Sequence, residues 1–210
     1  MQQGPAALGI DGLTLSRGAR VLFRDLSFSL RAGEFLSLEG PNGAGKTSLL
    51  RAIAGFLDPD KGAITLRTQS GDVLGEAEVR APFVGWLGEK DGAKAQMTPR
   101  EALHFFARFY RSAADVEAML SAMGLTRQGD LPVQYLSAGQ RRRLALARLS
   151  LSARPLWLLD EPFAALDGDG KRTVADSISA HCRAGGLAIA ATHEPMNVEG
   201  NRVVLGSPAA

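Results

Sequence analysis

The 210-residue chain is poor in cysteine, in net charge and in long apolar runs, and each shortage narrows what the protein can be. Its single cysteine, Cys182, excludes an internal disulfide and suits a reducing compartment. A formal net charge of +2 is too small to indicate nucleic acid as a partner. No apolar run approaches the roughly 20 residues of a membrane span, and the first residues show no secretory signal. We therefore expect a cytoplasmic protein that meets a membrane only through a partner.

What the chain does contain is the pattern of an α/β domain. Hydrophobic residues make up 45% of it, enough for one substantial core. Apolar runs typical of buried strands occur at residues 35–38, 156–159 and 187–191, and a helical pattern follows each of the first two. A helical block, residues 98–151, lies between the two α/β stretches.

The N-terminal part predicts shorter elements. Two short strands surround a turn at Arg17 and Gly18, and a separate half-exposed strand is expected at residues 26–30, where apolar residues alternate with serine. Residues 67–80 are polar and weakly patterned, which predicts surface loops.

A candidate phosphate-binding loop joins the first apolar strand to its helix. The run comprises Gly40, Pro41, Asn42, Gly43, Ala44, Gly45, Lys46 and Thr47, and Ser48 follows it. It fits the pattern G-x-x-x-x-G-K-[ST], in which glycines let backbone N–H groups and a helix N-terminus face phosphate oxygens. Lys46 would reach the β- and γ-phosphates, and Thr47 would hold Mg²⁺. A turn that only caps a helix is the alternative, but the strand, lysine and hydroxyl residue together favour the phosphate site.

Two adjacent carboxylates, Asp160 and Glu161, end the second apolar strand. In doubly wound sheets, ligands bind outside the carboxyl ends of the strands, so both acids are expected beside the phosphate loop. Asp160 would hold Mg²⁺, and Glu161 would orient the attacking water. The alternative is an acidic turn that caps the next helix.

A second anion site is expected at Ser137, Gly139 and Gln140, where a helix begins. The arginine run 141–143 that follows could suggest nucleic acid, but a solvated helix face is the favoured interpretation because the rest of the chain is not basic.

The three histidines divide into one candidate site residue and two structural ones. His193 follows Thr192 at the end of the third apolar strand, where a hydrogen bond to the γ-phosphate is expected. His104 lies on an apolar helix face and His181 near a helix end, and both are interpreted as structural.

Taken in order, these motifs resemble the nucleotide-binding subunit of an ABC transporter. The L-S-x-G-Q run at residues 136–140 is the most discriminating part, and residues 164–167 (Ala-Ala-Leu-Asp) also match. The resemblance implies a P-loop NTPase fold over residues 1–210, with a mixed core sheet, an antiparallel β subdomain and a helical subdomain at about 93–152. It also implies a dimer, in which Ser137 and Gly139 act on the ATP of the other subunit and Asp167 lines the seam.

Within that family, the chain is most similar to the ATP-binding subunit of the cytochrome c biogenesis haem exporter. Residues 136–148 (Leu-Ser-Ala-Gly-Gln-Arg-Arg-Arg-Leu-Ala-Leu-Ala-Arg) and 191–198 (Ala-Thr-His-Glu-Pro-Met-Asn-Val) carry this similarity. It implies ATP hydrolysis with Mg²⁺, coupled to membrane subunits at the cytoplasmic face of a bacterial inner membrane. Lys46, Glu161 and His193 would carry the catalysis.

Two departures from the ABC pattern affect the site. The adenine-stacking aromatic residue is absent, and Arg17 is the nearest candidate to replace it. The glutamine that usually precedes the helical insert is also absent around Glu89 and Lys90, and Gln96 comes later.

Two other functions stay open at this point. One is an ABC exporter subunit for another cargo, and the other is a soluble ABC-type assembly ATPase of the iron–sulfur scaffold type. A DNA-repair ATPase is disfavoured because no heptad arm interrupts the chain, and a tandem translation factor because only one nucleotide domain is present.

Overall fold

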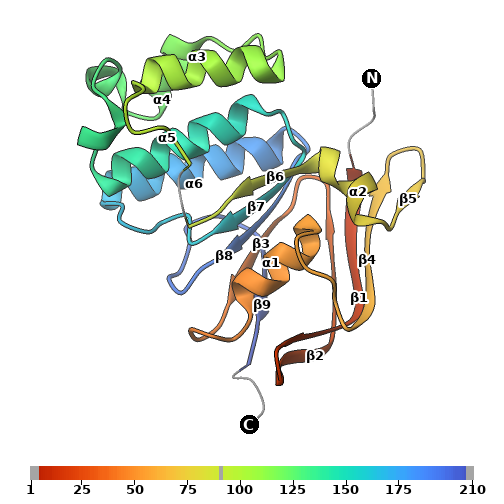
Figure 1. Cartoon of the computed structure of the whole chain (residues 1–210). Helices are drawn as coiled ribbons and strands as arrows, with labels where there is room; N and C mark the ends of the chain where they lie inside the picture. Colours follow the sequence, from red (N-terminus) through yellow and green to blue (C-terminus); the bar gives the residue numbers. More distant parts are fainter. Residues whose placement is uncertain (1–4, 90–91, 207–210) are drawn as a thin grey trace.

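Two β-sheets of opposite pairing type organise the chain in the computed structural model, which describes residues 5–89 and 92–206 (Figure 1). The parallel strands are β3 (Phe35–Glu39), β6 (Val84–Leu87), β7 (Leu156–Asp160), β8 (Leu187–Ala191) and β9 (Asn201–Val204). The antiparallel strands are β1 (Pro5–Arg17), β2 (Arg20–Arg31), β4 (Lys61–Thr68) and β5 (Val73–Leu74). The strand orders are β6-β7-β8-β3-β9 and β2-β1-β4-β5.

Both faces of the parallel sheet are covered, which explains why its strands are continuous apolar runs. The covering helices are α1 (Lys46–Ala54), α5 (Ala138–Leu151) and α6 (Gly168–Arg183). On β7, Leu156 and Leu158 pack with α1 and the antiparallel sheet, whereas Trp157 and Leu159 pack on the opposite face with α5 and α6. Each such leucine stabilises the fold by about 1.5–3 kcal/mol through its burial.

The core sheet differs from the mixed sheet that the resemblance implies. Every strand pair in the described part of this sheet is parallel. Parallel neighbours need a crossover, and α6 supplies one between β7 and β8 while the helical block supplies another between β6 and β7. The antiparallel strands form their own sheet, as expected.

The first hairpin turns at Gly18 and Ala19, one residue later than expected, and its second strand is one long element. β2 continues through Asp25, where two separate strands are expected from the sequence. Asp25 has a positive φ of 51°, and the register with β1 shifts nearby, so the strand bends there instead of ending.

Residues 67–80 hold more structure than the expected surface loops. They include the end of β4, all of β5 and the short helix α2 (Ala77–Arg80), which continues into a 3₁₀ turn at Ala81–Phe83. Arg80 is buried and donates hydrogen bonds to the carbonyls of Ile64 and Gly75, and this burial lowers its pKa.

The helical block consists of α3 (Pro99–Tyr110), α4 (Val116–Ala122), 3₁₀ turns at Thr126–Gln128 and Val133–Tyr135, and α5. Thr98 caps α3 in a capping box with Glu101. On α3, Leu103 is buried, whereas Phe109 is 69% exposed.

Helix α6 carries a half-buried histidine and the single cysteine of the chain. His181 stacks on Trp157 with 3.9 Å between ring centroids, and its Nε2 hydrogen-bonds the carbonyls of Pro155 and Leu187. Burial lowers the pKa of His181 and raises that of the Cys182 thiol to about 11. His181 is therefore structural, as predicted, whereas His104 is exposed instead of lying on a buried face.

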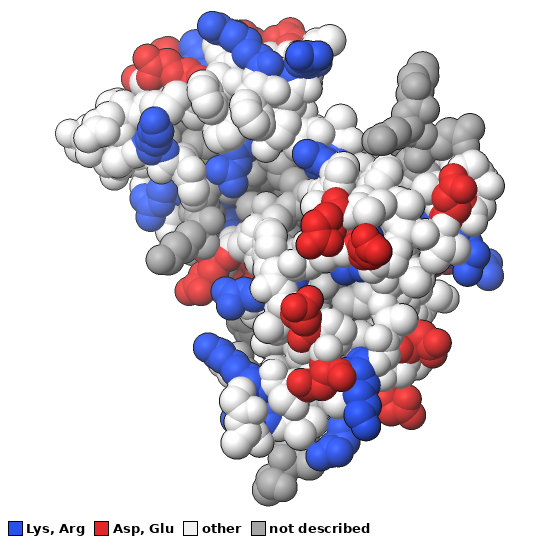
Figure 2. All heavy atoms as spheres, turned by 45° about the vertical axis from the view of Figure 1, so that its right-hand side comes forward, with Lys and Arg blue, Asp and Glu red and all other residues white. Residues whose placement is uncertain are grey.

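The surface carries charge of both signs. Acidic and basic side chains are interspersed over the face shown in Figure 2. In the described ranges, no helix is both long enough and apolar enough to cross a bilayer.

Candidate active site

The phosphate-loop residues 40–47 connect β3 to α1, as predicted. Gly45 adopts a φ of 100° and is the N-cap of α1, with no side-chain cap bond, so the first N–H groups of the helix remain available to an anion. A Cβ added at Gly45 would lie 3.2 Å from the ring of Phe23. The positive φ and the close approach of β2 together favour glycine here.

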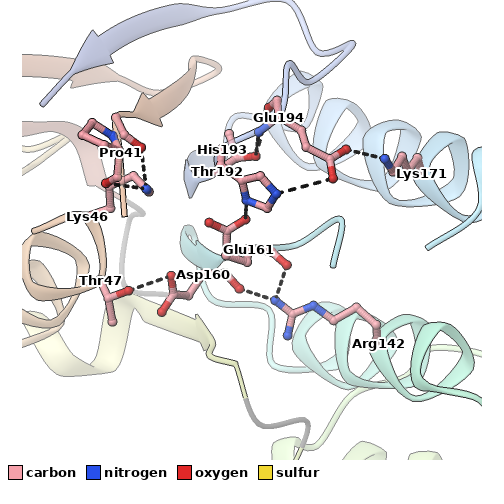
Figure 3. A network of polar contacts seen from close by, with 11 residues as sticks. Pro41, Lys46, Thr47, Arg142, Asp160, Glu161, Lys171, Thr192, His193 and Glu194 are labelled. Carbon is pink, nitrogen blue, oxygen red and sulfur yellow. Dashed lines mark hydrogen bonds and ion pairs between the residues drawn. The ribbon is translucent and has the colours of Figure 1, made fainter. Parts of the chain in front are cut away.

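The side chain of Lys46 folds back into the phosphate loop. Its side chain is buried, and Nζ donates to the carbonyl oxygens of Gly40 at 2.7 Å and Pro41 at 3.3 Å. Figure 3 shows the ammonium group folded back over this loop. A cation enclosed by the loop can neutralise the charge of a phosphate bound by the same backbone.

The side chains of Thr47 and Asp160 are in contact although the two residues are 113 positions apart in the sequence. The Thr47 hydroxyl donates to Oδ1 of Asp160 at 3.1 Å. Asp160 is 6% exposed, and burial raises its pKa, while the hydrogen bond from Thr47 opposes this shift. A hydroxyl and a buried carboxylate are hard oxygen donors of the kind that Mg²⁺ binds alongside phosphates and water. The pair therefore fits the predicted metal site.

Glu161 and His193 form a second pair in the same place. His193 Nδ1 lies 2.8 Å from Oε2 of Glu161, and both side chains are partly exposed. On its other side, His193 Nε2 is 3.7 Å from Glu194, which in turn pairs with Lys171 (Figure 3). The histidine is thus held between two carboxylates, and Glu161 is directed toward solvent-accessible space.

The topology explains why these residues converge. β7, β8 and β3 are neighbours in the parallel sheet, so their carboxyl ends lie at one edge. Asp160 ends β7, His193 follows β8 and the phosphate loop follows β3. Residues separated by more than 100 positions in sequence therefore share one site.

The L-S-x-G-Q residues lie at the start of α5. Ser137 accepts a hydrogen bond from the backbone N–H of Gln140, and the Gln140 side chain accepts one from the Ser137 N–H. The Ser137 hydroxyl keeps its own proton free to donate. A Cβ at Gly139 would approach the Ala165 carbonyl to 2.7 Å, so only glycine fits there. Within the described residues, no hydrogen bond joins this turn to the phosphate loop of the same chain.

Asp167 and Arg17 have local surroundings that the sequence does not reveal. Asp167 accepts a hydrogen bond from Gly170 N at 2.7 Å and is the N-cap of α6. Arg17 lies exposed at the end of β1, next to the β1–β2 turn. Phe23, which sequence reasoning overlooked, is the aromatic residue packed on the phosphate loop.

Arg142 is a further residue that sequence reasoning missed. The interpretation of residues 141–143 as a solvated face is wrong for it, because its side chain is 3% exposed. Its guanidinium donates to the carbonyls of Asp160 and Glu161, as Figure 3 shows, and to that of Gly88.

The structure describes only part of the segment around Glu89 and Lys90, where ABC subunits usually carry a glutamine. Glu89 is exposed just after β6, whereas Lys90 lies outside the described residues. Gln96 is exposed in the segment before α3.

Comparison with known proteins assigns this arrangement to a family. The profile of the ABC transporter family matches residues 23–164. The chain belongs to the ABC transporter family. Among curated relatives of the ABC transporter family, it is 46% identical over 187 residues to the cytochrome c biogenesis ATP-binding export protein CcmA of Hyphomonas neptunium, covering 89% of this chain and 90% of the relative. It is 42% identical to the protein of the same name from Maricaulis maris, over 97% of this chain and 94% of the relative.

The fold agrees with this membership. A putative ABC transporter ATP-binding protein from Pyrococcus furiosus superposes with a TM-score of 0.80 at 23% identity, covering 95% of this chain and 97% of that one. The protein is thus an ABC-type ATPase of the CcmA type, with the antiparallel β subdomain that the resemblance implies.

Proposed function

We propose that this ATPase hydrolyses Mg²⁺-bound ATP at the edge where β3, β7 and β8 end, and that the reaction powers haem export in cytochrome c biogenesis. The observation that carries the proposal is the convergence of an enclosed lysine, the Thr47–Asp160 pair and the Glu161–His193 pair within one site. These are the groups that in-line attack of water on a γ-phosphate requires.

Each group has a distinct task. The loop N–H groups and Lys46 bind and neutralise the phosphates. Thr47 and Asp160 would hold Mg²⁺, which supplies charge neutralisation at the phosphate oxygens when it is bound. Glu161 orients and polarises the attacking water, and His193, fixed by Glu161, donates to the γ-phosphate. Positioning and electrostatics thus carry the catalysis.

The complete site would contain two copies of the chain. Ser137 and Gly139 lie at a helix N-terminus with a free hydroxyl proton and are not bonded to the phosphate loop of their own chain in the part that the structure describes. We infer that they act on the nucleotide of the twin subunit, with Gln140 supporting the turn and Asp167 close to the seam.

A membrane partner of the haem exporter type is part of the proposal. Its support is an exposed apolar group: Phe56 is 66% exposed, packs edge-on against Trp86 at 5.6 Å and is followed by the partly exposed Leu57. Exposed aromatic groups of this kind favour a protein interface. The chain would then lie at the cytoplasmic face of a bacterial inner membrane, and haem need not touch it.

The experiment replaces Glu161 by glutamine in a strain that lacks the native gene. E161Q should bind ATP as the wild type does, accumulate as an ATP-bound dimer and hydrolyse ATP at least about 100-fold more slowly. Haem staining should show loss of c-type cytochromes, and membrane subunits should co-purify with the chain. Wild-type turnover would refute the role of Glu161, and normal cytochromes with stalled turnover would point to another cargo.

A further inference from the structure

We propose that Arg142 is a positioning residue for ATP hydrolysis, which holds the backbone of the turn carrying Glu161 and thereby fixes the direction of that carboxylate. The inference rests on the proposed role of Glu161. It adds Arg142, from the first turns of α5, to the residues at the ends of β3, β7 and β8.

Arg142 contacts the turn at Asp160 and Glu161 through backbone carbonyl oxygens. Its Nη2 donates to the carbonyl of Asp160 and, at 2.9 Å, to that of Glu161, while Nη1 donates to Gly88 O at 2.5 Å. The guanidinium is buried between α5 and the ends of β6 and β7 (Figure 3). Hydrogen bonds from a charged donor in such a buried place are roughly twice as strong as neutral ones.

The turn that Arg142 holds has an unfavourable backbone conformation. Glu161 has a φ of 49°, in the left-handed region, which is strained for a residue other than glycine. Its N–H donates to Ala191 O of β8 at 2.9 Å, and its carbonyl accepts from Ala164 N and from Arg142. Because the backbone angle at Glu161 sets where its side chain leaves the turn, the bonds that hold this angle also aim the carboxylate at His193.

A planar guanidinium is suited to this task. It presents several N–H donors in a fixed fork, so one side chain can serve carbonyls from two strand ends. Because Arg142 stands on the helix that begins with Ser137, the position of Glu161 also depends on the position of α5. The arginine therefore links the serine-bearing turn to the carboxylate within one chain.

The neighbouring arginines make different contacts and provide a matched control. Arg143 Nη1 donates to Met123 O at 2.7 Å and approaches Gly124 O, both inside the helical block. Like Arg142, it bonds backbone carbonyls from α5, but it does not touch the turn at Asp160 and Glu161.

The test compares R142Q and R143Q in the full chain, purified with the membrane subunits that accompany it. R142Q should lower kcat about 10–100-fold while the Kd for ATP changes less than about 3-fold, because a displaced group slows the chemical step without removing phosphate contacts. R142K should retain more of the rate than R142Q. R143Q should keep the wild-type kcat.

A double mutant separates this inference from the proposed function. If Arg142 acts through Glu161, adding R142Q to E161Q should lower the residual rate less than about 2-fold. If E161Q itself turns over normally, the proposed role of Glu161 fails. If E161Q stalls but both R142Q and R142K keep the wild-type kcat, the inference about Arg142 fails alone. If R142Q does not unfold cooperatively, its kcat is not used, and the kcat values of R142K and R143Q are compared instead. A wild-type kcat in R142K would then contradict the inference.

Discussion

Asp160 combines a structural cost with a binding role. Burial raises the pKa of Asp160, because the folded chain favours the protonated carboxyl group. The folded chain gains stability from this group below its ordinary pKa of 3.8, and it loses that stability as the pH rises through the raised pKa of the folded state. At neutral pH, D160N should therefore raise the free energy of unfolding of the nucleotide-free chain by about 1 kcal/mol, since an amide avoids the burial of charge.

The same substitution should abolish the stabilisation by ATP and Mg²⁺. Thermal unfolding with and without Mg²⁺–ATP measures both effects, and D176N, at an exposed position of α6, is the control. A D160N chain that is less stable than the wild type and is still stabilised by Mg²⁺–ATP would contradict the assignment.

His181 should make stability depend on pH. Because burial lowers its pKa below the ordinary 6.5, the unfolded chain binds a proton there that the folded chain does not, so the free energy of unfolding falls as the pH falls through 6.5. H181Q should lose stability at pH 8 through its lost stacking on Trp157, yet show a flatter decline between about pH 7 and pH 5.5. Denaturant melts measure this, and H104Q, at an exposed position, should keep the wild-type slope.

At the scale of single elements, two helices start with the same device but carry different functions. Thr98 begins α3 and Ser137 begins α5, each in a complete capping box. T98A and S137A should each lower the free energy of unfolding by about 1 kcal/mol. Only S137A should also slow ATP hydrolysis, because only its hydroxyl is proposed to meet nucleotide. Equal rates of ATP hydrolysis in the two variants would show that Ser137 acts only as a helix cap.

Sequence reasoning locates motifs on elements well where one residue type has one physical use. A glycine loop before a helix, a proline after Thr98 and an apolar strand before Asp160 each leave few alternatives. Arg142 is an example of a residue whose role the sequence alone does not predict. Three consecutive arginines span about 200° of a helix, so they face different surroundings, and nothing in the run tells which one is buried. The bend of β2 at Asp25 escaped for a similar reason, because a bulge depends on the partner strand.

At the scale of the whole molecule, the proposed site is completed only when two copies of the chain form a dimer. If Ser137 acts on the twin's nucleotide, mixing K46A and S137A chains should restore hydrolysis that neither has alone. Half of the dimers would be mixed, each with one intact site of two, so about one quarter of the wild-type rate is expected. Steady-state hydrolysis across mixing ratios measures this. No recovery in the mixture would place Ser137 on its own chain's nucleotide.

The buried thiol of Cys182 has a practical consequence. With a pKa of about 11, it is almost entirely uncharged at neutral pH and hence a poor target for alkylating reagents. A second cysteine introduced at an exposed position, such as Val204, could therefore take a spin label or fluorophore while the natural one stays silent. Distances between two labelled copies could then be followed through the ATP cycle in an otherwise native chain.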